Sequence, residues 1–185
     1  MPDSAHAGRV EYRQGDALAL PHEDAAFDAV AMALAVNFVP DPEKATAEMK
    51  RVVRPGGTVA TYMWDVLGGG FTMEPIRRGL GEMCIAAPIP GAETVRMERL
   101  HELWTNAGLD NVTTRRIDIT VSYSNFDDFW EANTAIRNSV SNAVASLPAA
   151  DVEGLRERVR AALPPGADGQ IAFAAHANAV KGTVR

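Results

Sequence analysis

Two patterns of hydrophobic and polar positions alternate along the chain and predict an order of strands and helices. The apolar runs at 29–34 and 58–64 are nearly continuous, as is typical of strands covered on both faces of a parallel sheet. Between them, residues 41–53 repeat apolar side chains at helical spacing, with Asp41 as the N-cap and Pro42 at the first helical position. This strand–helix–strand order predicts an α/β fold built on a parallel sheet.

The rest of the pattern predicts more strands and helices, without a linker that divides the chain. A short alternation at 10–13 predicts an additional early strand. Further on, we expect helices at 76–85, 94–107 (capped by Thr94), 126–146 and 151–163, and strands at 112–123 and 170–180. Residues 1–185 are therefore interpreted as a single domain. The segment 65–93, rich in Gly and Pro, is interpreted as a lid or a substrate-binding insertion.

Composition and charge exclude several classes of protein. The net charge is −6, and no cluster of Lys and Arg is present that could neutralise the phosphates of a nucleic acid. The longest apolar run, 29–36, is far shorter than the roughly 20 residues that cross a bilayer. The first residues are neither basic nor apolar, so a cytoplasmic protein is expected. One cysteine and four scattered histidines predict neither a disulfide nor a metal site.

Five short motifs follow one another at characteristic spacings. They are Gly15-Asp16-Ala17, Leu20-Pro21, Phe27-Asp28-Ala29-Val30, Val39-Pro40-Asp41-Pro42 and Val52-Val53-Arg54-Pro55-Gly56-Gly57. The later segments 100–109 and 171–173 continue the same order. Each motif is weak alone, but the succession resembles the S-adenosylmethionine-dependent small-molecule methyltransferases with a Rossmann-like fold. The resemblance covers nearly all of the chain.

The resemblance implies a fold in which part of the sheet is missing. In that family the strand order is 3-2-1-4-5-7-6, so 10–13, 29–34 and 58–64 would be the third, fourth and fifth strands. The sheet would be mostly parallel with an antiparallel last strand and helices on both faces. Only nine residues precede Val10, too few for the first two strands and their glycine-rich turn. We therefore expect the edge of 29–34 to be exposed, and to pair either with 10–13 or with a second copy in a homo-oligomer.

The resemblance also implies which residues bind the cofactor. Asp16 would accept a hydrogen bond from the adenine amino group, and the amide of Ala17 would meet the ring edge. Ala33 and Leu34 would lie beside the methionine part, and Asn37 would face the methyl acceptor. Simpler alternatives stay open for each: a turn carboxylate at Asp16, plain core at Ala33 and Leu34, and a cap at Asn37.

The function implied is the transfer of a methyl group from S-adenosylmethionine to a small molecule, impaired in a chain without the glycine-rich turn. Such a transfer depends on positioning more than on an acid or a base, and no catalytic residue is nominated. The alternative is a non-catalytic, methyltransferase-like fragment that acts as a binding or structural partner. A nucleotide oxidoreductase is disfavoured, because Gly68-Gly69-Gly70 does not have the G-x-G-x-x-G spacing.

Overall fold

The computed structural model describes residues 10–185, and its centre is a mixed four-stranded sheet. The strands are β1 (Phe27–Ala33), β2 (Val53–Trp64), β3 (Asp110–Tyr123) and β4 (Ile171–Thr183), in the spatial order β1-β2-β4-β3. β1 and β2 are parallel, whereas β4 is antiparallel to both of its neighbours. The predicted α/β class, the contiguous four strands and the antiparallel last strand are confirmed.

The connection between β1 and β2 is a short helix with the predicted start. In α1 (Pro42–Arg51), the side chain of Asp41 accepts a hydrogen bond from the backbone amide of Lys44 at 2.9 Å. The end differs from the prediction, because the chain enters β2 directly and the Pro-Gly-Gly sequence lies inside that strand. A side chain at Gly57 would come within 2.6 Å of the carbonyl oxygen of Asp28, so glycine is required where β2 passes β1.

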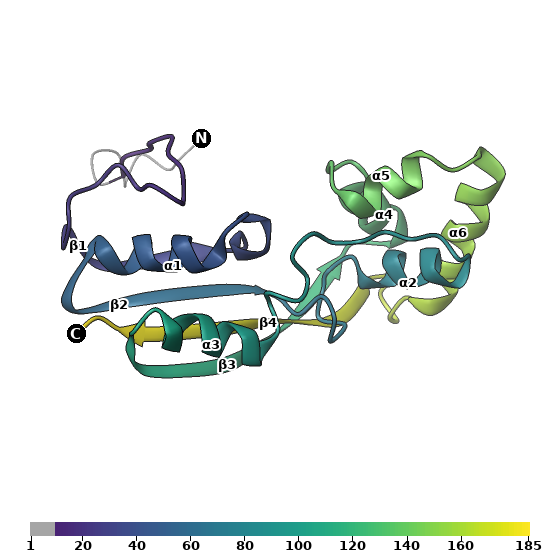
Figure 1. Ribbon diagram of the computed structural model, residues 1–185. Helices are drawn as coiled ribbons and strands as arrows, with labels where there is room; N and C mark the ends of the chain where they lie inside the picture. Colours follow the sequence, from purple (N-terminus) through teal and green to yellow (C-terminus); the bar gives the residue numbers. More distant parts are fainter. Residues whose placement is uncertain (1–9) are drawn as a thin grey trace.

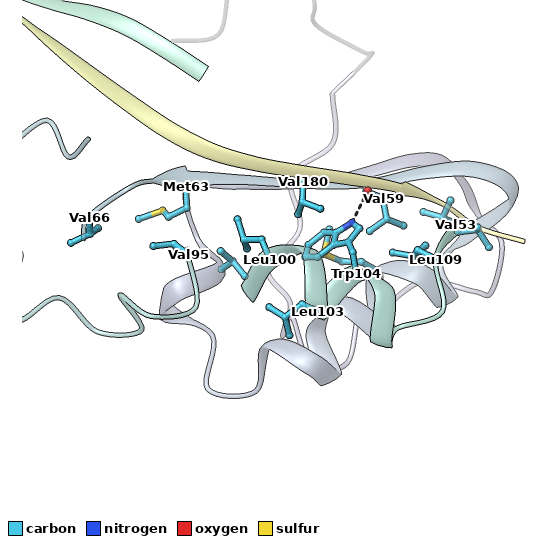
Figure 2. Packing of buried hydrophobic residues seen from close by; sticks show 13 residues of the cluster. Val53, Val59, Met63, Val66, Val95, Leu100, Leu103, Trp104, Leu109 and Val180 are labelled. Atoms are coloured by element: carbon cyan, nitrogen blue, oxygen red, sulfur yellow. Dashed lines mark hydrogen bonds between the residues drawn. The ribbon is translucent and has the colours of Figure 1, made fainter. Parts of the chain in front are cut away.

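The first hydrophobic core lies between one face of the sheet and the helices α1 and α3 (Met97–Asn106). Trp104 is fully buried there, and its indole N–H donates to the backbone oxygen of Val59 at 2.9 Å (Figure 2). Gly182 of β4 makes room for this ring, since a side chain there would come within 3.2 Å of it. A buried indole with its N–H paired retains its apolar contribution without a desolvation penalty.

A second core lies at the other end of the sheet, as Figure 1 shows. Four helices gather there: α2 (Glu74–Glu82), α4 (Phe126–Thr134), α5 (Ser139–Ala145) and α6 (Ala149–Ala162). Phe129 and Leu155 are fully buried in it, together with Ile171 at the start of β4. Ile76 and Leu80 of α2 are also fully buried. The segment 65–93 therefore contributes to a packed core, and its role as a lid stays a prediction.

Helices cover both faces of the sheet only in part. On the face opposite α1 and α3, the second core covers the end that carries Ile171 and Phe173. The rest of that face is open: Ala31 is exposed, Tyr62 is 39% exposed and Ile119 is 40% exposed. The prediction of helices on both faces is thus wrong for the half of the sheet that contains β1 and β2.

Three local predictions are also corrected. Residues 10–13 form no strand, because no neighbouring strand offers them backbone partners. The predicted helix at 126–146 is two helices, since Asn138 forms a capping box with Ser141 and starts α5 anew. Thr94 does not cap α3, whose N-cap residue is Arg96 without a side-chain hydrogen bond.

Candidate functional site

The carboxyl ends of β1 and β2 lie side by side, because the two strands are parallel and adjacent (Figure 1). Ala33 is aligned with Tyr62, and the amide of Leu34 donates to the oxygen of Tyr62 at 2.9 Å. Leu34 then adopts a left-handed conformation with φ of 53°, which turns the chain away from the sheet. Both Ala33 and Leu34 are exposed, so the interpretation as plain core does not hold. Ligands of open α/β sheets bind at this edge.

A short 3-10 helix, η2 (Val36–Phe38), follows this turn and holds the predicted acceptor-side residue. Asn37 is only 4% exposed, and its Nδ2 donates to the backbone oxygen of Pro90 at 3.0 Å. Its Oδ1 is buried and has no partner among the described residues. Gly91 has a positive φ of 61°, and a side chain there would collide with the oxygen of Asn37. Asn37 therefore fixes a loop against the end of β1, and it leaves one acceptor unsatisfied.

A cavity of about 350 Å³ opens next to η2. Its walls come from distant segments of the chain and are mostly apolar: Phe38, Met63, Val66, Phe71, Ile89, Pro90 and Val140. Polar groups occur on one side only, at Arg137, Asn138, Ser139 and Asn142. The volume, the apolar lining and the few polar groups are those of a small-molecule site. The sequence did not predict this site, because residues of α5 line it only after the chain has folded and they lie about 100 positions from Phe38.

Asp16 and Ala17 do not line this cavity. Oδ1 of Asp16 accepts from the amide of Leu18 at 2.9 Å, and Asp16 and Ala19 form an isolated bridge. This is the turn role that the sequence left open as an alternative. The carboxylate is nevertheless exposed, and Ala17 is half-buried. Their cofactor role stays a prediction.

Two charged side chains of α1 hold the segment after Asp16 in place. The carboxylate of Glu48 accepts from the amide of Leu20 at 2.9 Å and from two nitrogens of Arg51, also at 2.9 Å. Arg51 donates in turn to the backbone oxygens of Leu20 and His22. The hydrogen bond from Arg51 lowers the pKa of Glu48 from 4.5 to about 2. The pair anchors the loop to the helix, and no motif in the sequence indicated it.

A histidine–carboxylate pair lies beside the cavity wall. Nε2 of His176, in β4, lies 3.1 Å from Oδ2 of Asp65, just after β2. His176 is 8% exposed, and the neighbours of Asp65 include Val66, which lines the cavity. The two residues are 111 positions apart, so no spacing in the sequence could indicate the pair.

Groups of possible metal ligands and membrane-spanning helices were sought among residues 10–185. Within residues 10–185, no three His, Cys, Asp or Glu side chains are grouped so that they could hold a metal ion. Over the same range, no helix has the length and the apolar composition required to span a bilayer.

The start of the chain matches a known family. Residues 2–61 match the model of the methyltransferase domain family Methyltransf_11. Three relatives align with part of the chain. They are the Mycobacterium tuberculosis protein Rv1405c, 42% identical over 59 residues, the demethylmenaquinone methyltransferase of Desulfitobacterium hafniense, 43% over 61, and the C-methyltransferase UbiE of ubiquinone and menaquinone biosynthesis from Hahella chejuensis, 42% over 55. These matches cover 30–33% of this chain and 22–24% of the relatives.

Two solved structures resemble nearly the whole chain. The YcgJ protein of Bacillus subtilis has a TM-score of 0.56 at 16% identity, and the comparison covers 98% of this chain and 75% of YcgJ. A protein from an antibiotic biosynthesis pathway of Anabaena variabilis has a TM-score of 0.56 at 16% identity, with 96% and 74% covered. These likenesses extend the shared fold beyond residue 61, into β3, β4 and the second core.

Proposed function

Since this chain is related to S-adenosylmethionine-dependent methyltransferases, we propose that it takes part in methyl transfer to a small molecule held in the cavity beside η2. One observation carries the proposal. The cavity lies directly beyond the carboxyl ends of two parallel strands, where open α/β sheets bind ligands. β1 and most of β2 also fall within the segment that matches the family.

The residues at this edge fit one side of S-adenosylmethionine. Ala33 and Leu34 are exposed where the methionine part would lie, Ala33 has a small side chain, and the backbone of Leu34 has a positive φ. Asp16 uses Oδ1 for its own turn, while Oδ2 makes no hydrogen bond in the described residues and is free to accept from an amine. The cofactor supplies an electrophilic methyl group. Asp16, Ala17, Ala33 and Leu34 would bind and orient it.

The protein's part in such a reaction is positioning. Holding two reactants in near-attack geometry supplies several kcal/mol without an acid or a base, so the transfer does not require a general base. Asn37 supports the assignment of the acceptor side. Its orphaned Oδ1 is a buried acceptor, and its two neighbours in space, Phe38 and Pro90, line the cavity. A bound donor group would satisfy it.

The open half of the sheet favours a second candidate, a non-catalytic binding or structural role. Tyr62 and Ile119 are apolar and exposed on that face, and β1 has an unpaired edge in the described residues. The same openness predicts weak cofactor binding. A small-molecule site normally buries 70–90% of its ligand, whereas Asp16, Ala33 and Leu34 are all exposed.

Calorimetric titration of the chain with S-adenosylhomocysteine separates the two candidates. The methyltransferase role requires saturable binding, which we expect to be weaker than micromolar. Adenosine and homocysteine, titrated separately, serve as controls for partial occupancy. A complete lack of saturable binding would reject the methyltransferase role for this chain and leave the non-catalytic role.

A further inference from the structure

We propose that the cavity beside η2 selects small apolar molecules that carry one anionic oxygen group, and that Arg137 binds this group. The further step, that such a molecule is the methyl acceptor, rests on the proposed function. The binding preference itself follows from the chemistry of the cavity wall.

The apolar part of the ligand is dictated by the greater part of the lining. Met63 and Val66 come from the end of β2, Phe38 from η2, and Ile89 from the loop that Asn37 holds in place. A ligand with apolar atoms would bury these surfaces, and each Å² of apolar surface removed from water contributes about 25 cal/mol to binding. Phe38 is 61% exposed without a ligand, so its ring offers area that a bound molecule would cover.

The charge of Arg137 indicates the anionic part of the ligand. Arg137 is the only charged side chain among the residues that line the cavity, and no carboxylate lines it. Two other arginines, on the helices α2 and α6 of the second core, already have partners, Arg77 with Glu74 and Arg156 with Asp127. Arg137 has no such partner within residues 10–185. A guanidinium beside an apolar wall pairs best with a planar carboxylate, which it binds through two parallel hydrogen bonds.

The backbone that carries Arg137 is fixed. The hydroxyl of Ser141 donates to the oxygen of Ile136, and the side chain of Asn138 accepts from the amide of Ser141 at 3.0 Å. Nδ2 of Asn138 also lies 3.3 Å from the sulfur of Met73 in the second core. The residues on both sides of Arg137 are therefore anchored, and less entropy is lost when its side chain binds a ligand.

The test uses a matched pair of probes, naphthoate and the uncharged naphthamide, titrated into the whole chain by calorimetry. A hydrogen bond to a charged group predicts that naphthoate binds about tenfold more tightly than naphthamide. Arg137→Gln should abolish this difference and leave naphthamide binding unchanged. Arg78→Gln is the control, because Arg78 is also exposed but lines a different cavity.

Two further variants locate the binding. Phe38→Ala should weaken both probes to the same extent, since it removes apolar wall and no charge. Ser139→Trp should block both, because Ser139 lines the cavity and is only half-buried. Near-ultraviolet circular dichroism confirms that each variant is folded.

The titrations with naphthoate and naphthamide test the inference without S-adenosylmethionine. Equal affinities for naphthoate and naphthamide, no binding of either, or a preference that survives Arg137→Gln would each overturn the inference. If naphthoate binds through Arg137 while S-adenosylhomocysteine does not bind at all, this inference stands and the proposed methyltransferase role fails. If S-adenosylhomocysteine binds but naphthoate shows no preference that depends on Arg137, this inference fails and the proposed methyltransferase role stands.

Discussion

Nε2 of His176 lies 3.1 Å from Oδ2 of Asp65, and this pair joins the end of β2 to the middle of β4. The backbone strengthens the junction: the amide of Asp65 donates to the oxygen of His176, and the amide of His176 donates to the oxygen of Gly70. A side chain at Gly70 would come within 2.3 Å of the His176 oxygen. The loop 65–70 is therefore held closely against the sheet, next to the wall of the cavity.

We predict that His176→Ala destabilises the fold and loosens the cavity. The change leaves Oδ2 of Asp65 without its partner, while Oδ1 still accepts from the amide of Gly68 at 2.9 Å. Because Asp65 is partly exposed, the loss of this hydrogen bond should cost about 1 kcal/mol. Urea denaturation should show a lower free energy of unfolding by this amount, and naphthamide should bind more weakly. His101→Ala is the control, because His101 is exposed on α3. A stability equal to that of the parent would show that the pair is not formed in solution.

Glu48 should determine part of the acid sensitivity. Arg51 lowers the pKa of Glu48 to about 2 in the folded protein, from 4.5 without the interaction. A carboxylate with a lowered pKa stabilises the fold above pH 4.5 and loses this contribution as the pH falls toward 2. The melting temperature of the parent should therefore fall through this window, and that of Glu48→Gln should fall less. Glu131→Gln, an exposed change in α4, should behave like the parent; an identical acid profile for Glu48→Gln would contradict the assignment.

The parts of the fold that the sequence predicted are those with a strong local pattern. The continuous apolar runs became β1 and β2, and Asp41 caps α1 as its position before Pro42 indicates. The failures have physical reasons. An alternating tetrapeptide at 10–13 cannot form a strand without a partner, and Asn138 starts a new helix where apolar periodicity continued. In the first case the lack of strand pairing, and in the second the capping by Asn138, decided the structure against the local apolar pattern.

The candidate site was less predictable, because it is assembled from segments far apart in the chain. The family motifs indicated the edge at Ala33 and Leu34, and both residues are exposed there. They could not indicate Arg137 or Val140, which reach the cavity through the packing of the second core. Asn37 was interpreted as facing the acceptor, and that role stays a prediction; the hydrogen bond from its amide to Pro90 could not be predicted from the sequence. Long-range contacts of this kind have no signature in local periodicity.

The role of Asp16 can be tested separately from its place in the turn. Asp16→Asn keeps an oxygen that can accept from Leu18 but removes the charge, so the fold should be unchanged. If Asp16 accepts from the adenine amine, loss of a charge-assisted hydrogen bond should weaken S-adenosylhomocysteine binding about tenfold. Calorimetry at matched thermal stability measures this effect. Glu23→Gln provides a control carboxylate in the same segment, because Glu23 is exposed, and equal weakening by both changes would assign the effect to net charge instead.

The free edge of β1 predicts self-association. In the described residues β1 is an outer strand, and its sequence Phe-Asp-Ala-Val-Ala-Met-Ala contains neither Lys nor Pro, the residues that commonly protect such edges. Pairing of β1 with β1 of a second copy would satisfy its backbone groups and make a continuous sheet. Sedimentation velocity over a concentration series should therefore show a reversible dimer. Ala31→Lys places a charge on this exposed strand and should shift the protein to monomer, whereas Ala132→Lys, on an exposed position of α4, should not. A parent that stays monomeric at every concentration, or two variants that associate equally, would show that β1 is not the contact.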